Sequence, residues 1–184
     1  MQTMNAVVTN RQLLVRAATL ADVDVIVALV ESAYRGDSGR RGWTTESDIL
    51  DGQRVDAESV AEVIVKAQSQ VLLALQAATL IACAHIEKQD DACYFGMFAV
   101  NPDLQGNGTG KQMINEAERI ARERYQCTRM KMTVISVRDD LIAWYERRGY
   151  HRTGVFKPFP YGDERFGIPK RDDLKFEVLE KSLS

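Results

Sequence analysis

The sequence has few cysteines, no excess of basic residues and no long apolar run. Its three cysteines, Cys83, Cys93 and Cys127, show no Cys-x-x-Cys spacing, which argues against a disulfide framework or a metal site and favours reduced packing residues in the cytosol. Lys and Arg number 24 against 26 Asp and Glu, and a net charge of −2 argues against a nucleic-acid partner. No apolar run approaches 18 residues and no signal-peptide core is present. We therefore expect a soluble cytoplasmic protein with neither a membrane partner nor a metal.

The length of 184 residues suits one domain with a sizeable buried core. Residues 1–12 are polar and are interpreted as a flexible leader. No repeat, low-complexity tract or linker interrupts the rest of the chain. We therefore expect a single domain over residues 13–184.

One stretch, residues 98–111, organises the chain. The apolar run over residues 94–100 predicts a strand, and Asn101-Pro102 ends it. Three glycines follow, and from Lys111 onward the apolar residues recur at helical spacing. The pattern predicts a strand that leads through a glycine-rich turn into the N-terminus of a helix.

Such a turn is suited to binding an anion. A helix N-terminus carries unpaired backbone N–H groups and about half a positive charge. Glycine lets the backbone turn sharply and approach a phosphate closely because it has no Cβ atom. The stretch therefore predicts a pyrophosphate site, and the alternative is a tight strand-to-helix turn without a ligand.

Two common phosphate motifs do not match this turn. Walker A requires Gly-Lys-Ser/Thr, and the dinucleotide fingerprint requires a wider glycine spacing than that of Gly106, Gly108 and Gly110. The segment Gln105-Gly106-Asn107-Gly108-Thr109-Gly110 follows the pattern Gln/Arg-x-x-Gly-x-Gly/Ala after an apolar strand. On these residues the sequence resembles the GNAT superfamily of acyl-CoA-dependent N-acetyltransferases.

The order of the predicted elements is also the one expected of a GNAT domain. Periodicity and turn signals give a strand, two helices, three strands, a helix, a strand, a helix and two strands over residues 13–183. The expected fold is mixed α/β (α+β), with a mostly antiparallel sheet of about seven strands and about four helices, and the resemblance implies a splayed parallel pair at its centre. A short helix is expected over residues 46–50, and residues 157–173 are expected to form a loop.

The resemblance implies acetyl-CoA as co-substrate. The strand at Phe98 would hydrogen-bond the pantetheine arm and present an N–H group to the thioester oxygen, and the turn would hold the pyrophosphate. Arg138 stands where the family often has a cofactor-contacting asparagine, so it would pair with a CoA phosphate or be solvated. The residues so assigned are Phe98, Ala99, Val100, Gln105, Gly106, Asn107, Gly108, Thr109, Gly110, Lys111 and Arg138.

Tyr145 is the candidate general acid. It stands in the segment 144–150, which resembles the Tyr-x-x-x-Gly-Phe/Tyr segment of the family, where the tyrosine often protonates the departing thiolate. A phenol with a pKa near 10 suits that task. The alternative is a core aromatic residue on an amphipathic helix.

The general base has three candidates. His85 and Glu87 are two residues apart on a predicted strand, so their side chains share a face, in a row with Cys83. Either would take a proton from the amine, through water, if that face points into the cleft. The alternative is a satisfied core histidine beside a solvated charge. Glu31, one turn before Tyr34, is the third candidate.

The acceptor side is predicted in the polar, arginine-rich segment 35–54. A long irregular insertion in a compact domain is more often functional than incidental. We expect Glu31, Tyr34 and Trp43 to contact a small-molecule primary amine, and Arg35, Arg40 and Arg41 hint at an anionic group on it.

Other readings stay open at this point. The acceptor could be a protein N-terminus or lysine, and the protein could be a non-catalytic acyl-CoA sensor. The last strand and the 157–173 segment could serve a homodimer, which the sequence does not require.

Overall fold

The computed structural model describes residues 13–35 and 39–184. The predicted leader, residues 1–12, lies outside the described residues, so the proposed domain boundaries stay a prediction. The elements, in chain order, are β1 (Leu14–Ala17), η1 (Leu20–Asp22), α1 (Val23–Tyr34), β2 (Leu50–Asp51), α3 (Ala57–Val65), β3 (Ser69–Gln76), β4 (Thr79–Gln89), β5 (Ala92–Val100), η2 (Pro102–Leu104), α4 (Thr109–Glu123), β6 (Arg129–Ile135), α5 (Asp139–Glu146), β7 (His151–Pro158), η3 (Glu164–Phe166), β8 (Ile168–Pro169) and β9 (Lys175–Ser182).

Seven strands form one mixed sheet in the order β1-β3-β4-β5-β6-β9-β7. Every neighbouring pair is antiparallel except β5 and β6, which are parallel because α4 lies between them in the chain. The turn between β3 and β4 is two residues long, and Ala77 and Ala78 both have positive φ, the backbone that a tight hairpin demands. The mostly antiparallel sheet with one parallel pair confirms the predicted fold class.

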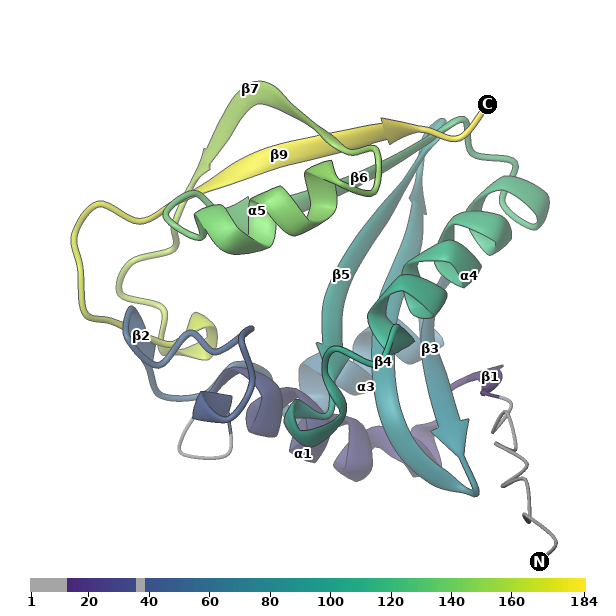
Figure 1. Ribbon diagram of the computed structural model, residues 1–184, viewed down its shortest axis with the longest axis horizontal. Helices are drawn as coiled ribbons and strands as arrows, with labels where there is room; N and C mark the ends of the chain where they lie inside the picture. Colours follow the sequence, from purple (N-terminus) through teal and green to yellow (C-terminus); the bar gives the residue numbers. More distant parts are fainter. Residues whose placement is uncertain (1–12, 36–38) are drawn as a thin grey trace, which may run out of the picture.

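The parallel pair separates soon after it begins. β5 and β6 pair only at Ala92, Cys93 and Tyr94, opposite residues 129–131, although β5 continues to Val100 and β6 to Ile135. Figure 1 shows the two strands meeting near the C-terminus and diverging from there. The second half of β5 therefore has a backbone edge without a strand partner on the β6 side.

A β-bulge bends β5 at the same place. Cys83 pairs with Ala99 and His85 with Gly96, so two residues of β5 oppose one residue of β4. Met97, inside the bulge, has a φ of +45°. A bulge of this kind redirects the side chains and the free edge of a strand.

Helices cover both faces of β3, β4 and β5. α1 packs on β4 and β5, α3 packs on β3, and α4 lies on the opposite face, against β4 and β5 (Figure 1). Local signals fix where the helices begin: Thr19 and Asp22 form a capping box, and the carboxylate of Asp56 accepts the Ser59 N–H at 2.8 Å.

Two segments differ from the sequence-based expectation. Residues 46–50 form a single hydrogen-bonded turn and not a helix, because the chain then enters β2 and pairs with β8. Residues 157–173 are not only loop, since they contain the end of β7, η3 and β8. The β2–β8 pair joins segments more than a hundred residues apart and is two residues long, so no local periodicity announces it.

The three cysteines, Cys83, Cys93 and Cys127, are buried and unpaired, as expected of packing residues. Within residues 13–35 and 39–184, no helix has both the length and the apolar character needed to cross a membrane.

Candidate active site

Two cavities meet at the separated half of β5. One, of about 220 Å³, is lined by Gly106, Gly108 and Gly110 and is called the glycine cavity here. The other, of about 260 Å³, is lined by Arg35, Arg54, Arg138 and Glu46 among others and is called the arginine cavity. Three residues line both cavities, namely Tyr34, Phe98 and Leu141. A long ligand in the glycine cavity could therefore place one end at the arginine cavity.

The glycine turn has the geometry of an anion site. Gly106 and Gly108 have φ values of +90° and +80°, and a Cβ atom built on either would meet no atom within 4 Å. Gly108 is the N-cap residue of the 15-residue helix α4, whose first turn carries no acidic side chain. Open space in front of unpaired N–H groups suits a phosphate.

The third glycine has a different role. A Cβ atom on Gly110 would lie 3.3 Å from Phe98 Cζ and from Trp144 Cζ2. Glycine at this position lets the start of α4 pack closely against β5 and α5. The position therefore favours a residue without a side chain even in the absence of a ligand.

Gln105 connects the turn to the segment after α1. Its Oε1 accepts the Trp43 N–H at 3.0 Å, and its Nε2 donates to Thr44 Oγ1 at 2.9 Å and to the Val100 carbonyl at 3.1 Å. Lys111 lines the glycine cavity, whereas Asn107 is exposed and lines neither cavity. The side chain of Gln105 thus positions the wall of the cavity.

The aromatic wall of the glycine cavity comes from three separate segments. Trp43, expected on the acceptor side, lines this cavity instead, with its ring centroid 6.1 Å from that of Trp144. Trp144 in turn lies 6.0 Å from the Phe98 ring and carries the Arg148 guanidinium 3.4 Å from its centroid. Apolar rings beside a glycine turn offer a surface for an elongated ligand that is apolar behind its phosphates.

Tyr145 lines the arginine cavity with a neutral phenol. It lies on α5, is 5% exposed, and its ring contacts Trp144 and Tyr150 with centroids 5.1 and 5.9 Å away. Within residues 13–35 and 39–184, no hydrogen bond occupies its hydroxyl. Burial raises the pKa of Tyr145 well above the ordinary value of a phenol. The group therefore keeps its proton through the physiological range.

Tyr34 separates the two cavities. Its hydroxyl donates a hydrogen bond to the Phe98 carbonyl, and the Arg54 guanidinium lies 5.2 Å from its ring centroid. Burial raises the pKa of Tyr34 to about 12, so its hydroxyl also stays protonated. Tyr34, predicted to contact the acceptor, lies at the end of α1, and Phe98, predicted to bind the cofactor, lies on β5, so this hydrogen bond joins residues assigned to different ligands.

Three arginines surround one carboxylate in the arginine cavity. Glu46 accepts hydrogen bonds from Arg35 and, at 3.2 Å, from Arg138 Nη1, and its Oε2 lies 3.7 Å from Arg54 Nε. Arg138 Nη2 also donates to the Thr44 carbonyl at 2.7 Å. These cations lower the pKa of Glu46 against the effect of its burial, so it remains ionised.

Arg138 consequently lies in the arginine cavity and lines no part of the glycine cavity, which differs from its expected place beside the cofactor phosphates. Its guanidinium is turned toward Glu46 because that carboxylate, brought in from the segment after α1, offers the stronger partner.

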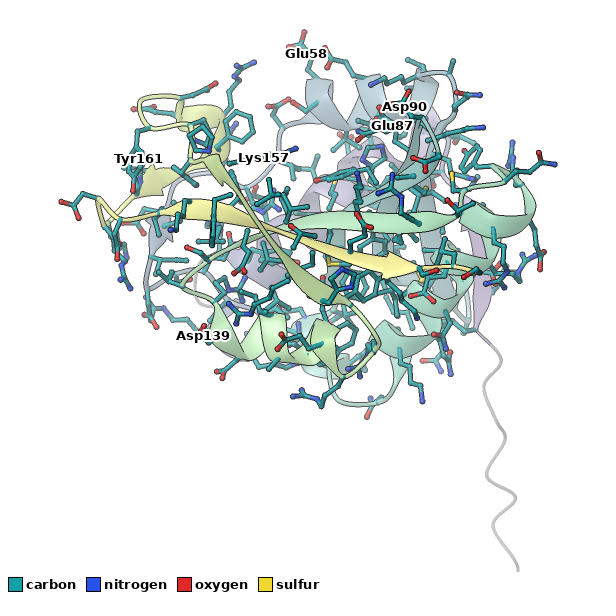
Figure 2. The ribbon with its side chains drawn as sticks, turned by 90° about the horizontal axis from the view of Figure 1, so that it is seen from above. Glu58, Glu87, Asp90, Asp139, Lys157 and Tyr161 are labelled. Carbon is teal, nitrogen blue, oxygen red and sulfur yellow. The ribbon has the colours of Figure 1, made fainter. Side chains whose placement is uncertain are left out.

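The structure does not bring the predicted bases to either cavity. His85 Nε2 lies 2.8 Å from Ser69 Oγ, and Glu87 pairs with Lys66 at 2.6 Å. The two side chains do share a face of β4, as predicted, but both are largely buried beneath α3 and line neither cavity. Figure 2 shows Glu87 beside Asp90, well apart from Asp139 at the start of α5.

Glu31, the third candidate, also has a structural partner. Its Oε1 accepts the backbone N–H groups of Arg54 and Val55 at 2.5 and 2.8 Å.

Burial lowers the pKa of His85 to about 4, so the imidazole is neutral at pH 7. In the described part of the chain, no group of three His, Cys, Asp or Glu side chains is arranged to hold a metal ion.

Several residues of the arginine cavity gave no signal in the sequence. Glu46 and Arg54 lie in an irregular segment without periodicity, and their importance appears only when α1, β6 and the 159–176 region converge on them. The Tyr94 side chain lies against Gly96, since a Cβ atom at position 96 would come within 2.6 Å of the Tyr94 ring. This contact forms only in the folded strand, so the sequence gives no sign of it. The lining residues that sequence reasoning missed include Glu46, Leu50, Arg54, Tyr94, Phe159, Phe166 and Phe176.

Known proteins resemble this chain in sequence and in fold. The sequence profile of the Acetyltransferase (GNAT) family matches residues 29–150. No curated relative matches the chain. Among solved structures, an N-acetyltransferase from Staphylococcus aureus Mu50 is similar with a TM-score of 0.68 and 16% identity, covering 94% of this chain and 98% of that one.

Two further similar structures act on different kinds of acceptor. The ribosomal-protein-S18-alanine N-acetyltransferase of Escherichia coli has a TM-score of 0.64 at 14% identity, with 94% and 95% of the two chains covered. A mutant spermidine N-acetyltransferase of Vibrio cholerae has a TM-score of 0.68 at 15% identity, with 95% and 96% covered. At these identities the likeness concerns the fold.

Proposed function

Because the chain belongs to the GNAT family of acetyltransferases, we propose that it transfers the acetyl group of acetyl-CoA to a primary amine on a small molecule. The observation that carries this proposal is the meeting of the two cavities at the free edge of β5, where Tyr34 and Phe98 line both and Tyr145 faces one. The glycine cavity suits the phosphates and the elongated arm of the cofactor. The arginine cavity is left for the acceptor.

The residues of the glycine cavity fit this co-substrate. Gly106 and Gly108 leave open space before the backbone N–H groups at the start of α4, which would hold the pyrophosphate. Lys111 lines the same cavity and adds a cation. The free edge of β5 at Phe98 and Ala99 offers backbone groups to the amides of the pantetheine arm, and a backbone N–H group there would stabilise the developing oxyanion.

Tyr145 is proposed as the proton donor. The acetyl transfer forms a bond between the amine nitrogen and the acetyl carbon, breaks the bond from that carbon to sulfur, and leaves a thiolate that needs a proton. Tyr145 holds its proton at neutral pH and no protein hydrogen bond engages it within the described residues. A phenol poised in this way suits general-acid catalysis.

The proton of the attacking amine is proposed to leave through water. Glu46, the carboxylate of the arginine cavity, is occupied by three arginines and keeps a lowered pKa, so it is a weak base. His85, Glu87 and Glu31 are engaged outside the two cavities. We therefore expect the acceptor to react as the free amine, with a rate that rises with pH until the amine itself is deprotonated.

The acceptor is proposed to be a small molecule. The arginine cavity measures about 260 Å³, and its lining includes segments 46–54 and 159–166, which lie outside the central sheet. A protein N-terminus or lysine would call for an extended groove. A non-catalytic acyl-CoA sensor is the other alternative, and it would bind the cofactor without releasing free CoA in the presence of any amine.

The test is a screen of primary amines with wild-type protein and acetyl-CoA. Free CoA is followed with a thiol reagent, and the acetylated amine is identified by mass spectrometry. The proposal predicts amine-dependent thiol release with one acetyl group gained per thiol. Tight binding of acetyl-CoA without turnover across the screen would favour the sensor, and acetylation of peptides alone would favour a protein acceptor.

A further inference from the structure

We propose that the arginine cavity binds an anionic group of the acceptor, so that the substrate is an amine that also carries a carboxylate, as in an amino acid with an apolar side chain. This inference rests on the proposed function, because it concerns the acceptor of that reaction. It goes further by naming the chemistry that the cavity selects. Three observations carry it.

The first observation is the balance of charge. Arg35, Arg54 and Arg138 line the cavity together with a single carboxylate, that of Glu46. Glu31 stands behind Arg54 and is bonded to backbone N–H groups, so counting it still leaves one positive charge in excess. Buried charges in proteins are paired, because an unpaired one is costly to remove from water. The surplus therefore points to a negative charge that arrives with the ligand.

The second observation is a set of unused hydrogen-bond donors. Arg35 is 7% exposed, and its Nε and Nη2 are buried without any hydrogen-bond partner. Arg54 Nε lies 3.7 Å from Glu46 Oε2, and no hydrogen bond from the Arg54 Nη atoms is found among residues 13–35 and 39–184. Buried donors without partners are rare in native proteins. Guanidinium groups match the two oxygens of a carboxylate.

The third observation is the character of the remaining wall. Phe159, Phe166 and Phe176 line the same cavity, with Leu50 and Met97. Phe159 is buried, and its ring centroid lies 5.6 Å from that of Phe176. An acceptor that fits both parts has an anionic end and an apolar body. A polycation such as spermidine is disfavoured, because it would add positive charge to a cavity that already has an excess.

Matched acceptor pairs test the inference with unmodified protein. Each proteinogenic amino acid is compared with its amide, and L-phenylalanine is compared in addition with 2-phenylethylamine and with spermidine. All assays follow CoA release at saturating acetyl-CoA and at a pH above the amine pKa of each pair, so that amine ionisation does not decide the result. We expect at least one acid to exceed its amide in kcat/KM by about 10- to 100-fold, the range for a charge-assisted hydrogen bond.

The Arg54→Gln variant tests the cluster directly. Arg54 is the most accessible of the three arginines, with 32% of its side chain exposed, so its replacement disturbs the core least. We expect KM for the preferred acid to rise about 10- to 100-fold, with kcat nearly unchanged and KM for the matched amide unaffected. Arg40→Gln serves as the control, because Arg40 pairs with Asp48 at 3.5 Å, is exposed and lines neither cavity.

The outcomes separate this inference from the proposed function. Equal or faster acetylation of amides, of 2-phenylethylamine or of spermidine would overturn the anionic acceptor while leaving the acetyltransferase intact. Equal loss of acid and amide turnover in Arg54→Gln would show a merely structural cluster and would also overturn it. If no amine of either kind releases CoA, the proposed function itself fails.

Discussion

Replacement of Tyr145 by phenylalanine removes the proposed proton donor and little else. The hydroxyl has no hydrogen-bond partner within the described residues, so its loss leaves no buried group unsatisfied. The ring would keep its contacts with Trp144 and Tyr150. We therefore expect the Tyr145→Phe protein to fold with a free energy of unfolding within about 1 kcal/mol of the wild-type value.

The effect on the reaction should be large. General-acid catalysis contributes roughly 10²- to 10⁴-fold, so kcat should fall by at least about 100-fold, or about 3 kcal/mol in the activation barrier. The dissociation constant of acetyl-CoA should change less than about twofold, because Tyr145 lines the arginine cavity and not the glycine cavity. Stopped-flow or steady-state CoA release gives kcat, and calorimetric titration gives the affinity.

Tyr150→Phe is the matched control. Tyr150 is also buried in the same aromatic cluster, but its hydroxyl donates to Glu118 Oε1 at 2.9 Å and it lines neither cavity. This variant should lose about 1–3 kcal/mol of stability and keep its kcat. A Tyr145→Phe enzyme with wild-type kcat would refute the assignment of the proton donor, and so would an equal loss of kcat in both variants.

Three further predictions follow from single positions. Gly108→Ala should weaken acetyl-CoA binding at least about tenfold, because it places a methyl group in the open space at the start of α4. Gly154→Ala, at a similar φ of +76° on β7, is the control. Each variant should lose about 1 kcal/mol of stability, but calorimetry should find the affinity unchanged in Gly154→Ala. Glu46→Gln should cost about 3–5 kcal/mol in urea unfolding, because the buried guanidinium groups of Arg35 and Arg138 and the partly exposed one of Arg54 lose their counter-charge. The exposed Glu123→Gln should cost less than about 1 kcal/mol, and equal losses would contradict the buried cluster. The pKa of His85 is lowered to about 4, so below pH 6.5 the unfolded chain binds more protons than the folded one. The free energy of unfolding should therefore fall by roughly 2 kcal/mol between pH 7 and pH 5, relative to the His85→Gln protein. Parallel pH profiles of the two proteins would show that His85 is not buried in its neutral form.

The part of the site that lies in one continuous stretch could be predicted from the sequence. The strand end at Val100, the glycine turn and the start of α4 follow one another along the chain, and each leaves a local signal in apolar spacing, in proline or in glycine. The parallel pairing of β5 with β6 could be inferred because a helix lies between them. Tyr145 was reached through a resemblance and not through periodicity.

The arginine cavity could not be predicted in this way. Its charged residues come from the end of α1, the irregular segment after it and the residue before α5, and only the fold brings them around Glu46. Arg138 was expected to pair with a CoA phosphate or to be solvated, whereas in the fold it hydrogen-bonds a carboxylate 92 positions earlier in the chain.

His85 and Glu87 show how close a pattern can come and still miss the cavity. Their alternation correctly placed both side chains on one face of β4, the face that α1 and α3 cover. The cavity opens at the neighbouring strand, where β5 leaves β6 after Tyr94. The alternation of a strand fixes the face of a side chain but not its distance from a gap one strand away.

The most direct test of the account is a titration of ¹⁵N-labelled protein with CoA, followed by backbone amide NMR. If main-chain groups of the glycine turn bind the diphosphate, the amide signals of Gly106, Gly108 and Gly110 should shift in a saturable way, together with those of Phe98 and Ala99 on the free edge of β5. Unchanged signals at the turn under conditions where CoA binds elsewhere, or no binding at all, would contradict the account.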